Sequence, residues 1–482
     1  MKKIFGKGLI VLAAALLVGW IIALYGCGGG AGPLRVAAPT PGVPGLTAEF
    51  ESLLPEGQRG ATFIGSEACA DCHGGRQGQP EPVYVAWRRT KHAEKGVGCE
   101  QCHGPGSRHR ENPSGQNILT FPKIVSSVVC GQCHGPIYQD WLASKHDQII
   151  RTPSELAITN PAVYGRTCLQ CHSGLFRIQV GERGVNLATL STERIVELAN
   201  QTLDAAPHAA TCATCHDPHR NTGNLSDDGK EVQLRHLVFN TDLSAIDPGS
   251  PVTEHTNFNH ICGQCHNGRG ADPSDATLTR ATARPNMHDS NQFNMLMGIG
   301  GVEGTGPVIR NTAHAQIPGQ CSTCHMPRSR HTMTASYDIS CTPCHTPADA
   351  AARTATVKAE VETALYALRR RMEQWAQATF GDNALWDYTA LLAQEGKTPP
   401  DQAQVPIQVK RARHNYYFVL RDRCFGPHNA PYIRHLIRVA NENLDAINVP
   451  RVNPWALASR VSRSEIRSLL ERDRRRALSA DH

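Results

Sequence analysis

The chain has 482 residues, of which 40% are hydrophobic and only 6% aromatic, so ordinary side chains provide a thin core for this length. Three of its six net positive charges are Lys2, Lys3 and Lys7, and the +3 that remains excludes the strongly basic surface of a nucleic-acid-binding protein. Eighteen cysteines argue against the reduced cytosol, and in an exported protein they would first suggest disulfides.

The N-terminus has the pattern of an export signal, because the three lysines precede an uncharged apolar run from Leu9 to Tyr25. Leu24-Tyr25-Gly26-Cys27 resembles a bacterial lipoprotein signal, which predicts a signal peptide at 1–26 and a lipid on Cys27 that attaches the protein to a membrane. The alternative is an uncleaved N-terminal anchor, since the run is near the minimum spanning length. Both interpretations place the protein outside the cytoplasmic membrane, on the periplasmic side or at the outer membrane. Residues 27–60, rich in glycine and proline, are expected to form a tether.

Eight copies of the pattern CxxCH follow. Their cysteines are Cys69, Cys72, Cys99, Cys102, Cys130, Cys133, Cys168, Cys171, Cys212, Cys215, Cys262, Cys265, Cys321, Cys324, Cys341 and Cys344. Their histidines are His73, His103, His134, His172, His216, His266, His325 and His345. CxxCH is the attachment signal of c-type haem, because two thiols on one helical turn reach the two vinyl groups of one porphyrin and the adjacent histidine binds the iron. Disulfides or a zinc ribbon would not require that histidine. We therefore expect eight covalently bound haems c.

The haem-bearing region is predicted at 61–348, with about 35 residues for each haem. At that density neighbouring porphyrin edges should lie within about 10 Å of each other, close enough for fast electron tunnelling. The porphyrins then replace the missing apolar core. We expect a mainly α fold with much irregular loop, in which the chain wraps around eight stacked haems.

The motifs resemble those of the multihaem c-type cytochromes, and the chain is similar to the octahaem members of the superfamily that includes hydroxylamine dehydrogenase and pentahaem nitrite reductase. An electron-transfer haem needs a sixth ligand, usually His or Met. In cytochromes of this kind, histidines in contexts such as W-x-x-[ST]-K-H and CHGPGSRH serve as that ligand, and the alternative for each is a solvent-exposed histidine. CHDPH places His219 only three residues after His216, so His219 would have to bind a neighbouring haem. The expected second ligands are His92, His109, His146, His219, His288, His314, His331 and His428. The remaining candidates, expected at the surface, are His208, His236, His255 and His260.

His428 is predicted as a ligand because Cys424 to Ile437 is similar to the H-N-P-x-Y segment that opens the last helix of those enzymes, with Asn429 and Tyr432 in step. A helical bundle is expected at 349–449, since apolar residues recur at helical spacing in three segments. These segments run from 357 to 375, from 405 to 421 and from 433 to 444. The basic tail at 450–482 is expected to be a solvated helix face, with a docking patch as the alternative.

Two functions are open at this point. The first is electron transfer between other redox proteins, with every iron bound on both sides. The second is an octahaem oxidoreductase for a small nitrogen or sulfur compound such as hydroxylamine, nitrite or tetrathionate, with one iron open. All eight motifs end in histidine, so the CxxCK mark of nitrite reductases is absent, and we favour electron transfer without excluding catalysis. A homo-oligomer is left open, and catalytic residues are not predicted.

Overall fold

The structure is a computed structural model of the whole chain. It describes residues 46–75, 81–148, 168–182, 184–205, 210–239, 260–268, 273–279, 290–307, 309–310, 312–342, 344–388, 392, 396–454, 456 and 460–478. The predicted signal peptide at 1–26, the predicted lipid attachment site Cys27 and the predicted ligand His288 lie outside the described residues.

The fold is mainly α with long irregular connections, as predicted. In the described residues the β structure is limited to isolated β-bridges. Most of the described helices before residue 346 have one or two turns, and α14 is longer. The helices of this part are α2 (Ala48–Leu53), α3 (Ser66–His73), α4 (Val83–Trp87), α5 (Lys91–Glu94), α6 (Glu100–His103), α7 (Ser107–Glu111), α8 (Ser127–Gly131), α9 (Gly135–Leu142), α12 (Leu169–His172), α13 (Gly174–Arg177), α14 (Thr192–Ala205), α15 (Cys212–Cys215), α16 (Asp275–Leu278), α17 (Gln292–Met297) and α18 (Cys321–His325).

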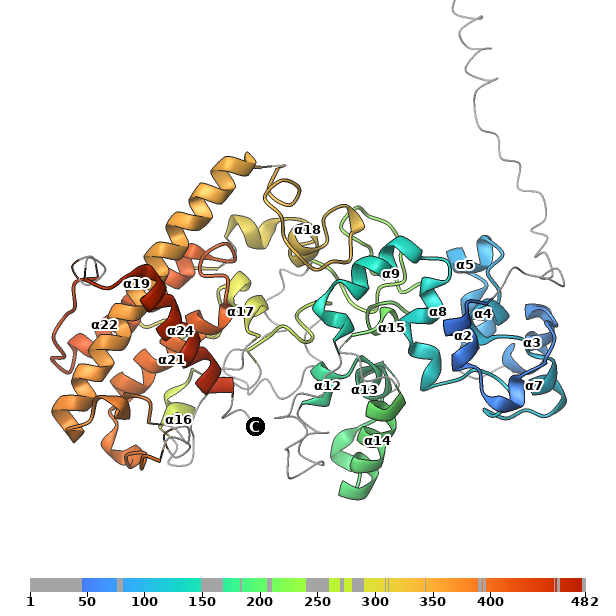
Figure 1. Cartoon of the computed structure of the whole chain (residues 1–482), viewed down its shortest axis with the longest axis horizontal. Helices are drawn as coiled ribbons and strands as arrows, with labels where there is room; N and C mark the ends of the chain where they lie inside the picture. The colour runs from blue at the N-terminus through green and yellow to red at the C-terminus, as the bar shows by residue number, and fades with distance from the viewer. Residues whose placement is uncertain are drawn as a thin grey trace, which may run out of the picture.

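These short helices form an elongated body that begins with α2 to α7 at one end, and the longer C-terminal helices occupy the other end (Figure 1). The apolar cores of the two parts differ. The short helices share four small clusters of three to five buried residues, whereas one large cluster joins the C-terminal helices. Side chains alone therefore do not fill the first part, which agrees with the expectation that another group does.

In the described residues the C-terminal bundle has four helices, which are α19 (Pro347–Phe380), α21 (Ile407–Asp422), α22 (Ala430–Asp445) and α24 (Arg463–Leu478). The first begins after Thr346, whose hydroxyl accepts a hydrogen bond from the Asp349 amide, and ends at Gly381 in the left-handed conformation. Three of the helices match the predicted segments in order.

The fourth helix, α24, lies in the range predicted as a solvated tail, and the structure differs there. Ile466 and Leu470 are each 2% exposed and belong to the large apolar cluster. The buried carboxylate of Asp473 accepts hydrogen bonds from Arg369 of α19 at 2.6 Å and from the Tyr416 hydroxyl of α21 at 2.7 Å. The arginine-rich composition conceals this narrow apolar side of the helix.

The tether predicted at 27–60 also differs, because its last part is folded. Helix α2 begins at a Thr47 cap, whose hydroxyl accepts from the Phe50 amide. The Phe50 side chain is fully buried in a cluster with Leu119 and Val129. The buried Phe50 thus helps to attach the end of the predicted tether to the haem-bearing part.

The glycine-rich segment at 298–306 is irregular and packs on the C-terminal helices. A Cβ on Gly301 would lie 2.4 Å from the end of the Leu436 side chain, so any other residue here would require Leu436 to move. The Gly301 amide donates to the Tyr432 hydroxyl at 3.0 Å. In the part of the chain that the structure describes, every helix is too short or too polar to cross a membrane.

We predict that Leu470→Ala lowers the free energy of unfolding by about 2–5 kcal/mol, because it leaves a cavity in the bundle core. The matched control on the same helix is Arg475→Ala, whose side chain is 74% exposed and should cost no more than about 0.5 kcal/mol. Thermal unfolding followed by far-UV circular dichroism measures both. If both variants lowered the free energy of unfolding by the same small amount, this result would contradict the packing of α24 on the bundle.

Candidate functional site

Each CxxCH motif forms one helical turn. The histidine amide donates to the carbonyl of the first cysteine, for example His103 to Cys99 at 2.9 Å and His345 to Cys341 at 2.8 Å. Residues three and four apart share one face of such a turn, so both thiols and the imidazole project together. This is the arrangement that the haem-attachment chemistry requires. We number the motifs, in chain order, as sites 1 to 8.

Seven motif histidines lie opposite a second histidine, with ring centroids 6.0–6.5 Å apart. The pairs, from site 1 to site 8 without site 4, are His73–His109, His103–His219, His134–His92, His216–His331, His266–His146, His325–His428 and His345–His314. Every second histidine in this set is one that the sequence predicts.

The spacing of the rings matches two ligands of one metal ion. Imidazoles on opposite sides of an ion, each with a metal–nitrogen bond of about 2 Å, have centroids about 6 Å apart. The interplanar angles range from 16° to 89°, although direct ring stacking prefers particular orientations. Rotation of the rings about a nitrogen–metal–nitrogen axis changes the interplanar angle but not the distance between the centroids, which is the pattern of the seven pairs.

The repeated pattern W-x-x-[ST]-K-H folds in the same way at both of its copies. The Thr90 hydroxyl donates to the Trp87 carbonyl at 2.7 Å and accepts from the Ala93 amide at 3.4 Å. The Ser144 hydroxyl likewise donates to the Trp141 carbonyl at 2.7 Å and accepts from the His146 amide at 3.1 Å. The hydroxyl residue thus ends one helix and starts the next turn, which directs the following histidine inward.

His428 is positioned by the start of α22. The Asn429 side chain caps this helix by accepting from the Tyr432 amide at 3.0 Å, and Pro431 occupies the first turn. The Tyr432 hydroxyl donates to Glu303 at 3.1 Å and accepts from the Gly301 amide. The segment that resembles H-N-P-x-Y is therefore a helix cap that fixes the histidine in front of it, opposite His325 of site 7.

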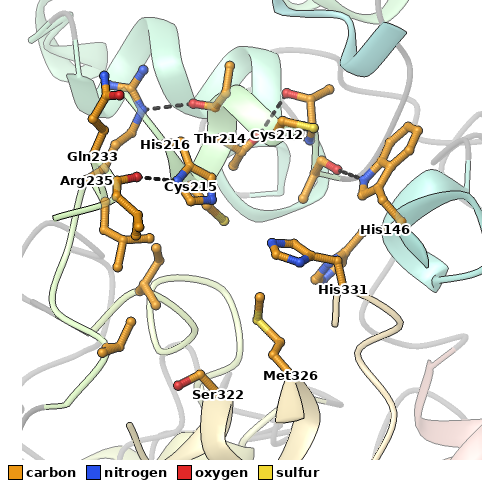
Figure 2. A pocket seen from close by; sticks show the side chains of 18 of the residues that line it. His146, Cys212, Thr214, Cys215, His216, Gln233, Arg235, Ser322, Met326 and His331 are labelled. Carbon is orange, nitrogen blue, oxygen red and sulfur yellow. Dashed lines mark hydrogen bonds between the residues drawn. The ribbon is translucent and has the colours of Figure 1, made fainter. Parts of the chain in front are cut away.

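One continuous cavity of about 3180 Å³ is lined by all eight motif histidines and by the seven histidines that face them. A pocket for one small molecule measures about 300–1,000 Å³, so this space suits several large groups. Figure 2 shows part of it, where His216 and His331 point into the same open space and Cys212 and Cys215 lie on the turn that carries His216. The thiol pairs, the imidazole pairs and the space between them fit haem c.

Contacts between motif cysteines indicate which sites are neighbours. In the described residues four pairs of motif thiols are adjacent: Cys69 and Cys99, Cys130 and Cys212, Cys171 and Cys265, and Cys262 and Cys321. Three further pairs lie near enough for their charges to interact: Cys102 and Cys133, Cys215 and Cys262, and Cys324 and Cys341. The sites therefore follow the order 1, 2, 3, 5, 6, 7, 8, and site 4 lies beside site 6.

Burial lowers the pKa of most of the facing histidines. It brings the pKa of His146 to about 4, aided by the nearby His266, and the pKa of His219 to about 4, aided by His103. A neutral imidazole is the form that binds metal. At His428 burial has the same lowering effect, but the Asp422 carboxylate outweighs it and raises the pKa.

Three other residues complete the comparison with the sequence. His172 of site 4 lines the cavity, and His288, the remaining predicted ligand, lies outside the described residues. His260, expected at the surface, is instead fully buried. Its ring lies 4.7 Å from that of Phe293, and its Nδ1 accepts from the Cys262 amide at 3.2 Å, so it supports the turn of site 6.

Sequence reasoning missed Asp422, the last residue of α21. Its Oδ1 accepts a hydrogen bond from His428 Nδ1 at 2.5 Å, and its side chain is fully buried. No repeated pattern marks this aspartate in the sequence. A single aspartate six residues before a predicted ligand is the one available signal.

Comparisons with known proteins agree with this geometry. A family model described as cytochrome c554 and c-prime matches residues 54–104. The C-type polyheme cytochrome OmcC of Geobacter sulfurreducens is 27% identical over 183 residues, which are 34% of this chain and 22% of OmcC. OmcB of the same species is 27% identical over 177 residues, 35% of this chain and 22% of OmcB. The chain thus matches about a fifth of the length of these curated relatives.

Two solved structures are also similar. The undecaheme cytochrome from the S-layer of Carboxydothermus ferrireducens has 20% identity and a TM-score of 0.45, covering 74% of this chain and 51% of that one. The outer cell wall cytochrome OcwA has 20% identity and a TM-score of 0.46, covering 72% and 70%. The motif turns and the family match at residues 54–104 thus make the chain similar to multihaem c-type cytochromes.

We predict that His146→Ala converts one haem from low to high spin and leaves all covalent haems attached, because it removes the imidazole opposite His266 and no attachment residue. Magnetic circular dichroism of the oxidised protein measures the spin state, and mass spectrometry counts the haems. The control is His435→Gln, because His435 bonds the Glu303 carbonyl at 2.8 Å and lies outside the seven pairs. An unchanged spectrum for His146→Ala would exclude it as a ligand.

Proposed function

We propose that this protein is an extracytoplasmic octahaem cytochrome that transfers electrons between other redox proteins through closely spaced haems. One observation carries the proposal: seven pairs of facing imidazoles line a single cavity together with the thiols of the CxxCH turns. Haem supplies one-electron chemistry, and at the seven paired sites a histidine on each side of the iron would leave no position for a substrate.

The contacts between cysteines support a continuous path through the haems. A cysteine joined to the porphyrin lies at the ring edge, so contact between cysteines of two motifs brings two porphyrin edges together. The path would run from site 1 near α3, through sites 2, 3, 5 and 6, to site 8 next to α19. Electrons would then enter and leave at opposite ends of the elongated body, and site 4 would be a side branch from site 6.

We also propose that the protein is attached to a membrane by a lipid on Cys27. The export signal in the sequence supports this location, and redox proteins of the same compartment are then its donor and acceptor. Cys27→Ser should move the protein from the membrane fraction to the soluble fraction without changing its haem content, because the modified thiol is lost. Cys424→Ser is the matched control and should leave the distribution unchanged. Retention of the Cys27 variant in membranes would support an uncleaved anchor instead.

The alternative function, oxidation or reduction of a small nitrogen or sulfur compound, requires an iron with an open position. Protein-film voltammetry distinguishes the two functions. We expect reversible one-electron waves whose summed charge corresponds to eight haems, and no catalytic current with hydroxylamine, nitrite or tetrathionate. A catalytic current with any of these compounds would overturn the electron-transfer proposal.

A further inference from the structure

Asp422 is a buried carboxylate in direct contact with one histidine of site 7. It ends α21, its side chain is fully buried, and its Oδ1 lies 2.5 Å from His428 Nδ1, the ring nitrogen that a metal-bound imidazole leaves free for a hydrogen bond. The Oδ2 atom is also buried and has no hydrogen-bond partner in the described part of the chain. The carboxylate therefore places a buried negative charge directly beside His428.

The other paired histidines have different partners. Backbone carbonyls lie beside the Nδ1 atoms of His103, His109, His216, His314, His325 and His331, at 2.5–3.3 Å. His266 faces the neutral amide of Gln292 at 3.3 Å. A carboxylate also lies near His345, but Asp349 is 3.5 Å away and 42% exposed, so water screens its charge.

We propose that Asp422 lowers the reduction potential of the haem at site 7 and makes it a step in potential along the chain of haems. This proposal rests on the proposed function, in which His325 and His428 bind that iron. Removal of one electron gives the iron an additional positive charge, which the buried carboxylate stabilises. A hydrogen bond to a carboxylate also makes the imidazole a more basic ligand, which favours the ferric form in the same way.

Site 7 lies between sites 6 and 8, so a low potential there affects electron transfer between them. Its cysteines contact those of site 6 on one side and those of site 8 on the other, so electrons that pass between these two must cross it. A haem of low potential holds an electron only briefly. Site 8 would then hold electrons separately from the other haems. It would exchange electrons with them across the energy barrier that the low potential of site 7 creates.

The test is Asp422→Asn in the full-length holoprotein, which keeps the shape and removes the charge. Spectroelectrochemical titration should show one haem whose equilibrium constant for reduction rises at least tenfold, a shift of about 59 mV for one electron. Asp422→Glu retains the charge, so the haem at site 7 should keep most of its low reduction potential. Asp349→Asn is the matched control, and it should shift no haem by a comparable amount because its carboxylate is exposed.

A second variant separates this inference from the proposed function. His428→Ala should make one haem high-spin and thereby identify the signal of site 7. If His428→Ala leaves every haem low-spin, the ligand assignment itself is wrong. If it produces a high-spin haem but Asp422→Asn leaves all potentials unchanged, only the role of Asp422 is overturned.

Discussion

The distance between two imidazoles on opposite sides of one iron determines much of this structure. The seven pairs hold ring centroids 6.0–6.5 Å apart, and four of them join residues more than 100 positions apart in the chain: His103–His219, His146–His266, His216–His331 and His325–His428. A disulfide also joins distant segments, but here each link would include a porphyrin that buries apolar surface. The loops before residue 346 are thus constrained by ligand bonds more than by their own apolar side chains.

The two ends of the molecule are consequently stabilised in different ways. The C-terminal bundle has a conventional core, reinforced by buried ion pairs such as Asp387–Arg413, whose atoms lie 2.6 Å apart. The body of short helices has only small apolar clusters around a continuous cavity. His428 connects the two parts, because it stands at the start of a bundle helix and faces site 7. Its hydrogen bond to Asp422 therefore couples the helical domain to the haems.

Local chemistry was predictable from the sequence, because it depends on residues close together in the chain. The CxxCH turns, the W-x-x-[ST]-K-H turns and the Asn429 cap are each formed within about a dozen residues. The second histidines could be named for the same reason. Their partners could not, since pairing depends on how distant loops meet, and the order that places site 5 next to site 3 is a property of the tertiary structure.

Residues without a local pattern were misplaced or missed. His260 was expected at the surface, but Phe293 and the turn of site 6 bury it. The apolar side of α24 was concealed among arginines, and the burial of Phe50 at the end of the predicted tether was not foreseen. Asp422 has only its place six residues before His428 as a signal, because the sequence does not distinguish a buried carboxylate from a solvated one.

Anomalous diffraction from crystals of the holoprotein, recorded at the iron absorption edge, tests the central claim most directly. We predict an iron atom midway between the two rings of each of the seven pairs, in the spatial order of sites 1, 2, 3, 5, 6, 7 and 8. An iron that lies away from its pair, or that is bound by a histidine from a different pair, would contradict it.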